Sequence, residues 1–173
     1  MKLKEINKAR YRKHLNIVIA ILIVSLMALA LLFGQAFIAL FADAGGDNFK
    51  FNLAGVVVAG LICLKGLHGF KDHDFMVEVY YVWQLKQSLN KIFRKLKKIE
   101  EARDSNEDSK RNVMALTILT YYYAASEQLF KLDDNTITLD SLSLASQTLQ
   151  EKILAANLEI NVADYEQSLL SDF

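Results

Sequence analysis

Apolar residues are concentrated in two stretches of the N-terminal part of the chain, and the first stretch is the longer. No charged residue occurs between Leu15 and Ala42. At about 1.5 Å per residue, a helix over this stretch is roughly 40 Å long, which exceeds the hydrocarbon core of a bilayer at about 30 Å. The pattern therefore predicts a membrane-spanning helix over residues 15–42. A cleaved signal peptide is the alternative, because Ala42-Asp43-Ala44 has the form of a cleavage site, but the apolar run is about twice the usual length.

The second apolar stretch is shorter, and its length alone does not separate a membrane span from a buried helix of a soluble protein. It is free of charge from Phe51 to Leu64, over 14 residues. Extension to Phe70 gives 20 residues, which suffices for a span if Lys65 places its ammonium group in the headgroup region. Gly45-Gly46 suits a tight reversal between the two stretches. We therefore expect a two-helix transmembrane hairpin over residues 15–70, with its second span at about 51–70.

Basic residues flank the hairpin on both sides and indicate its orientation. Residues 1–14 contain six basic side chains and one acidic one, residues 65–103 contain nine basic ones, and the 43–50 loop contains two acids and one lysine. Because lysine and arginine near the ends of spans stay on the cytoplasmic side, both flanks are expected in the cytoplasm and the loop outside. The basic N-terminus 1–14 and a domain over residues 71–173 then share that side, and both termini are cytoplasmic.

The residues after the hairpin show the periodicity of helices. One set of apolar positions, spaced 3, 4, 3, 4 and 3 residues apart, forms a stripe along a helix: Val82, Leu85, Leu89, Ile92, Leu96 and Ile99. Further helices are expected over residues 107–132 and 139–156, with a short one over 162–170, and the chain has no proline to interrupt them. The predicted fold is an all-α membrane protein, a transmembrane helical hairpin followed by a cytoplasmic helical bundle or hairpin domain.

Two sets of residues are candidates for contacts between helices. Gly55 and Ala59 are small residues four positions apart, a spacing that lets helices approach closely in lipid, either within the hairpin or between two chains. The stripe over residues 82–99 is the second set, and it suits packing within one chain as well as a contact between two chains.

Four basic residues, Lys91, Arg94, Lys95 and Lys98, fall largely on the other side of the striped helix and are candidates for contact with anionic lipid. That contact requires the helix to lie flat on the membrane, which its amphipathic pattern permits. Pairing with acidic helices downstream, or plain solvation, is the favoured alternative, since residues 1–103 carry a net charge of +8 and residues 104–173 a net charge of −8. The acidic region also argues against nucleic acid as a partner, because it would repel a phosphate backbone.

Candidate chemistry is confined to the stretch LKGLHGFKDHDF, residues 64–75, which holds His68, Asp72, His73 and Asp74. His68 and Asp72 could share a helix face, but a metal site needs three or four ligands, so we favour a simple exit from the membrane. The single cysteine, Cys63, excludes a disulfide within the chain. Glycine-rich phosphate loops, paired CxxC motifs and HExxH are absent from the sequence. We therefore assign no catalytic, cofactor-binding or metal-binding residue.

Three strings in the sequence resemble those of a known family. They are KARYRKHLNIVI at residues 8–19, FMVEVYYVWQLKQSLNKIFRKLKK at 75–98 and LDDNT at 132–136. Together they resemble an uncharacterised bacterial membrane-protein family, domain of unknown function 3087. The resemblance implies a bacterial inner-membrane protein and brings no catalytic residue with it.

The leading functional hypothesis is a non-enzymatic scaffold anchored in the inner membrane by the hairpin. Its helical domain would bind a partner protein or a second copy through the 82–99 stripe and through Gly55 and Ala59, which would raise the effective concentration of that partner at the membrane. Two alternatives remain open. One is a small subunit of an oligomeric transporter or channel, and the other is an enzyme whose site assembles from scattered residues of the helical domain.

Overall fold

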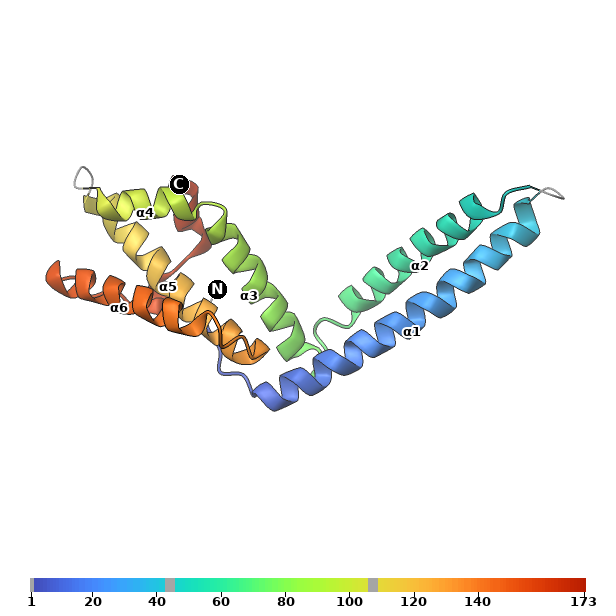
Figure 1. Cartoon of the computed structure of the whole chain (residues 1–173), viewed down its shortest axis with the longest axis horizontal. Helices are drawn as coiled ribbons and strands as arrows, with labels where there is room; N and C mark the ends of the chain where they lie inside the picture. Colours follow the sequence, from blue (N-terminus) through green and yellow to red (C-terminus); the bar gives the residue numbers. More distant parts are fainter. Residues whose placement is uncertain (1, 43–45, 106–108) are drawn as a thin grey trace. The chain divides into compact units, whose positions relative to one another are not determined.

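The computed structural model describes residues 2–42, 46–105 and 109–173, and all regular structure within these ranges is helical (Figure 1). The all-α prediction is therefore confirmed. The α-helices are α1 (Lys8–Phe41), α2 (Phe49–Gly69), α3 (Val77–Phe93), α4 (Leu96–Asp104), α5 (Ser109–Asp133) and α6 (Leu139–Ala155). Two 3₁₀ turns, η1 (Val162–Asp164) and η2 (Gln167–Asp172), follow them. The expected reversal at Gly45, the Asp43-Ala44 part of the cleavage-site pattern and the expected helix start at residue 107 lie outside the described residues.

The chain divides into two compact units, whose limits differ from the segments drawn from the sequence. One unit is Lys8–Tyr80, called the hairpin unit here, and the other joins the segment up to Asn7 to Tyr81–Phe173 and is called the helical unit. The expected N-terminal segment 1–14 is thus divided between them, because Lys8 to His14 continue into α1 as its first turns.

In the hairpin unit, α1 and α2 run side by side in opposite directions (Figure 1). Both helices are long and apolar enough to cross a membrane. The side-chain carboxylate of Asp47 accepts a hydrogen bond from the backbone N–H of Phe49 at 2.9 Å, which supports the first turn of α2. Most large apolar side chains of both helices are exposed, with Leu40, Leu31 and Leu64 among the most exposed. In a bilayer such side chains face acyl chains, while the helical hydrogen bonds satisfy the backbone.

In the helical unit, α5 is the central element, because α4, α6, η1 and η2 all pack on it. Two polar contacts also link α3 to α5: Tyr81 donates from its hydroxyl to Oε1 of Gln128 at 3.0 Å, and Lys86 forms an ion pair with Asp133 at 2.8 Å. The core of the unit is built from side chains with no exposed surface on several of these helices: Leu85, Ile92, Ile99, Ile118, Leu119 and Tyr121.

The sequence predicts one uninterrupted helix through the 82–99 stripe, and this prediction is wrong at Arg94 and Lys95. There α3 ends and α4 begins after a tight turn, in which the N–H of Lys95 donates to the carbonyl of Ile92 at 2.9 Å. The turn redirects the chain so that α4 packs on α5. Neither proline nor glycine marks the break, so packing on α5, rather than local preference, is what ends the helix.

The N-terminal segment is held to the helical unit by a ring of hydrogen bonds. The N–H of Lys4 donates to the hydroxyl of Tyr81 at 2.9 Å, and Nε2 of Gln128 donates to the carbonyl of Lys4. The hydroxyl of Tyr81 in turn donates to Gln128, which closes the ring. Burial raises the pKa of the Tyr81 phenol, and the hydrogen bonds with Lys4 and Gln128 partly offset this rise.

The C-terminal segment forms η1 and η2 in place of the short helix expected over residues 162–170. Asn161 and Asp164 cap η1 reciprocally through their side chains. Next to η1, the ring of Tyr165 stacks on Tyr121 of α5 with centroids 4.0 Å apart. The stacking fixes the C-terminal segment to the centre of the helical unit.

A matched pair of isoleucines tests the assignment of the core. We expect Ile118→Ala to lower the free energy of unfolding of the full chain by about 2–5 kcal/mol, because Ile118 is fully buried and its loss leaves a cavity. Ile137 is 91% exposed, so Ile137→Ala should change stability by less than about 0.5 kcal/mol. Chemical unfolding in detergent micelles, followed by circular dichroism, measures both. Equal losses for the two variants would contradict the core described above.

Candidate functional site

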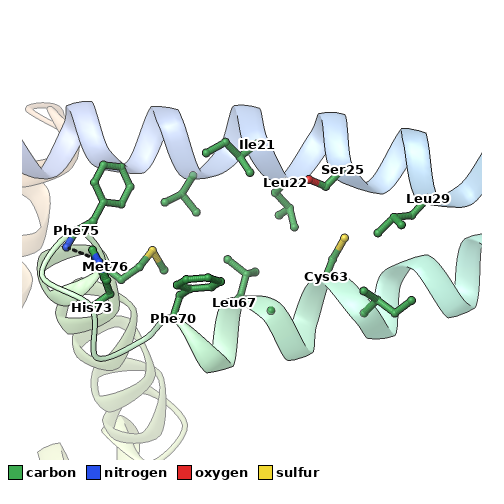
Figure 2. A pocket seen from close by; sticks show the side chains of 13 residues that line it. Ile21, Leu22, Ser25, Leu29, Cys63, Leu67, Phe70, His73, Phe75 and Met76 are labelled. Atoms are coloured by element: carbon green, nitrogen blue, oxygen red, sulfur yellow. Dashed lines mark hydrogen bonds between the residues drawn. The ribbon is translucent and has the colours of Figure 1, made fainter.

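An apolar cavity of about 500 Å³, open on one side, lies between α1 and α2 in the hairpin unit. Figure 2 shows side chains of both helices and of the segment after α2 directed into it. The lining residues come from three segments: Val18, Ile21, Leu22, Ser25 and Leu29 of α1, Ile62, Cys63, Gly66 and Leu67 of α2, and Phe70, His73, Phe75 and Met76 after α2.

The cavity exists because the two helices are in close contact elsewhere along their length. A Cβ atom added to Gly55 would lie 2.5 Å from the backbone nitrogen of Gly34 and 3.0 Å from the carbonyl oxygen of Ala30. Gly34 and Gly55 therefore place the two backbones in direct contact, which only glycine permits. At Gly66 an added Cβ would meet no atom within 4 Å, so the helices have separated there and leave open space.

The chemistry of the cavity suits an apolar occupant. Its few polar atoms are the hydroxyl of Ser25, the thiol of Cys63 and the ring nitrogens of His73. Nδ1 of His73 accepts a hydrogen bond from the N–H of Phe75 at 3.2 Å, drawn as a dashed line in Figure 2. This bond holds the imidazole at the turn after α2. Between such walls the preferred ligand is a hydrocarbon chain.

A buried polar contact lies at the start of α1, next to Phe75. The imidazole of His14 stacks on Phe75 with centroids 4.1 Å apart, and its Nδ1 lies 3.9 Å from Oε2 of Glu78. Nε of Arg10 lies 3.5 Å from the same carboxylate oxygen. Sequence reasoning missed this contact, because His14 and Glu78 are 64 positions apart and no periodicity or spacing relates them.

The histidine and aspartate cluster occupies the end of α2 and the turn that follows. His68 lies in the last turn of α2, while Asp72, His73 and Asp74 lie between α2 and α3. Among the residues that the structure describes, no three histidine, cysteine, aspartate or glutamate side chains are grouped to hold a metal ion. The geometry is that of a helix end, where Phe70 donates from its N–H to the carbonyl of Gly66.

Gly55 and Ala59 are the buried residues of α2, and Gly55 lies against α1 of the same chain. The residue opposite, Gly34, was not singled out from the sequence. It is the only glycine in the first apolar stretch, and this feature of the sequence could have indicated a close contact between helices.

The 82–99 stripe lies inside the helical unit. Val82, Leu85, Leu89, Ile92 and Ile99 are buried within the single chain, and Leu96 is partly exposed at the start of α4. The structure thus uses this stripe for packing within one chain, and a partner would have to bind elsewhere on the helical unit.

The basic residues of α3 and α4 are only partly neutralised by the acidic helices. Lys86 pairs with Asp133, whereas the side chains of Lys91, Arg94 and Lys98 make no ion pair within the described ranges. Nζ of Lys95 donates to the carbonyl of Leu170 at 2.6 Å, which is a contact with the backbone. Farther along, Asp104 accepts hydrogen bonds from Arg103 and from Lys152, and these lower the pKa of its carboxyl group.

A family model described as "Protein of unknown function (DUF3087)" matches residues 1–170. The chain belongs to this family. The match confirms the resemblance found from the three sequence strings. The family carries no enzymatic assignment. No curated protein and no solved structure matches the chain.

Glycine substitutions in α2 test the helix contact and the cavity together. We expect Gly55→Ala to destabilise the full chain by about 1–3 kcal/mol, because the added methyl group would meet the backbone of Gly34. Gly66→Ala and Gly60→Ala serve as controls, since an added Cβ has open space at both positions and alanine favours a helix. Thermal unfolding in detergent, monitored by circular dichroism, compares the three variants. A Gly55→Ala variant as stable as Gly60→Ala would disprove the close approach.

Proposed function

We propose that this protein is a helical interaction module anchored in the bacterial inner membrane, which holds a partner protein or a second copy of itself at the membrane surface. The hairpin unit is the anchor, and the helical unit is the binding module. Both termini lie in the cytoplasm in this proposal.

The observation that carries the proposal is the outer face of α6. The inner face of this helix is used, because Leu149 and Ile153 are buried against the rest of the helical unit. On the outside, Leu144 is 66% exposed and Leu154 is 65% exposed, and Ile137 is almost fully exposed just before the helix. Exposed leucine and isoleucine side chains on a helix are the anchors that a partner helix or groove buries.

The proposed location rests on the two apolar helices and on the charges that flank them. Six basic residues precede the first apolar stretch and nine follow within residues 65–103, while the connecting loop has two acids and one lysine. This asymmetry supports the cytoplasmic placement of both flanks. Tethering a partner protein to the membrane raises its effective concentration near other membrane-bound molecules. A membrane anchor can act in this way without any catalytic activity.

Reporter fusions test the orientation. Alkaline phosphatase, which is active only outside the inner membrane, should be inactive when fused after Phe173 and active when fused in the loop at Asp47, because the basic flanks stay inside. A fluorescent protein that matures only in the cytoplasm should show the opposite pattern. Activity of the phosphatase after Phe173 would refute the proposed orientation.

A pair of substitutions on α6 tests the binding face. Leu144→Glu should reduce the yield of crosslinked complexes in intact membranes by about tenfold, because a carboxylate would be buried against an apolar surface. Gln84→Glu is the control, since it adds a carboxylate at an exposed position of α3, away from α6 in the sequence. Masses of the crosslinked species separate a homodimer from a complex with another protein. Complexes unaffected by Leu144→Glu, or reduced equally by Gln84→Glu, would contradict the proposed face.

A further inference from the structure

A small groove lies where α3 ends, α4 begins and the C-terminal segment passes. It has a volume of about 350 Å³ and is called the junction groove here. Its lining comes from the last turn of α3, the α3–α4 turn and η2: Lys91, Arg94, Lys95, Gln167, Leu170 and Ser171. Figure 1 shows the C-terminal segment beside the end of α3 and the start of α4. A second groove, of about 430 Å³, shares Lys91 and Gln167 with it and extends to Trp83.

The lining of the junction groove is positively charged and contains no acid. Lys91 and Arg94 are exposed and make no ion pair with any residue that the structure describes. Glu166 and Asp172 flank the lining residues of η2 in the sequence, but neither of them lines the groove. Three cations in one groove repel each other, and this repulsion favours the binding of an anion.

The helix ends at the turn do not neutralise these cations. The C-terminus of α3 bears a partial negative charge, which would favour basic residues. However, α4 begins at Leu96, directly after the turn, and its N-terminus contributes a partial positive charge at the same place. The two contributions oppose one another, and Lys95, the residue before α4, makes no side-chain hydrogen bond that caps this helix.

The far wall of the groove is held in place by two other basic side chains. Lys95 donates from Nζ to the carbonyl of Leu170 at 2.6 Å. Arg111 donates from Nη2 to the carbonyl of Asp172 at 3.2 Å, and its guanidinium lies 5.2 Å from the centroid of the Phe173 ring. These contacts fix η2 beside α3, so Gln167 and Ser171 stay opposite Lys91 and Arg94.

We propose that the junction groove binds a phosphate-bearing anion. Lys91 and Arg94 donate charge-assisted hydrogen bonds to its oxygens, and the amide of Gln167 adds a neutral donor. Lys95 acts as a positioning residue, since its ammonium group holds η2 in place. The anion is either a soluble phosphate compound or the headgroup of an anionic phospholipid, because both present the same oxygens. This site is independent of the α6 face proposed above, and either proposal can fail alone.

Trp83 provides the signal for the test, because it is the only tryptophan and lines the adjoining groove. The full chain is placed in nanodiscs of phosphatidylcholine, and its fluorescence is recorded during titration with pyrophosphate at constant ionic strength. In a second arm, the same spectra are recorded in nanodiscs with increasing proportions of phosphatidylglycerol and no pyrophosphate. A saturable change in the first arm identifies a soluble phosphate compound as the source, and a change in the second arm alone identifies the lipid headgroup.

Three variants decide whether the junction groove is responsible. Lys91→Gln and Arg94→Gln should each weaken binding by about tenfold, because each removes a charged hydrogen-bond donor. Lys98→Gln removes the same charge from an exposed lysine of α4 that does not line the groove, and it should change binding by less than about twofold.

The two groove variants replace exposed side chains, and circular dichroism verifies that each keeps the helix content of the parent. Either variant alone is sufficient for the test. The proposal is overturned if neither arm changes the fluorescence of Trp83. It is equally overturned if Lys98→Gln weakens binding as much as the groove variants do, because binding would then follow total charge.

Discussion

The backbone contact between Gly34 and Gly55 is the constraint on which the hairpin unit depends. Helices in lipid gain nothing from burying apolar surface against each other, so close packing must come from small residues at the contact. Here the two glycines bring the backbones together, since a single added methyl group at Gly55 would lie 2.5 Å from the nitrogen of Gly34. The cavity near Gly66 follows from the same geometry, because helices that touch at one level and carry larger side chains at another must leave space between them.

In the helical unit the corresponding constraint is burial around α5. Side chains from α3 and α4 complete its core, which includes Leu85, Ile99 and Ile118 with no exposed surface. To reach α5 from both sides of the turn, the chain bends at Arg94 and Lys95, in the middle of the longest basic run of the sequence. The bend brings basic residues together opposite η2, and it thereby creates a groove that a straight helix would not have.

The two binding surfaces that we propose for the helical unit differ in chemistry. In our proposals the exposed leucines of α6 contact a protein partner, whereas the basic junction groove holds an anion. The 82–99 stripe is not available for either purpose, since it already packs inside the chain.

The sequence by itself determined the helical composition, the two long apolar helices and the limits of α6, which begins at the predicted Leu139 and ends one residue early. These features depend on hydrophobic periodicity and on run length, which are local properties. It also indicated Gly55 and Ala59 as contact residues, and it identified the basic cluster of which three members line the junction groove.

Only the tertiary structure decided where those residues lie and what they face. No local sequence signal marks the helix break at Arg94 and Lys95. The same is true of two long-range contacts, the hydrogen-bonded ring of Lys4, Tyr81 and Gln128 and the pair of His14 and Glu78. In each case the deciding energy comes from packing or hydrogen bonding between distant parts of the chain. The sequence pattern indicates which residues are apolar or can form hydrogen bonds, and the folded chain determines which residues each of them contacts.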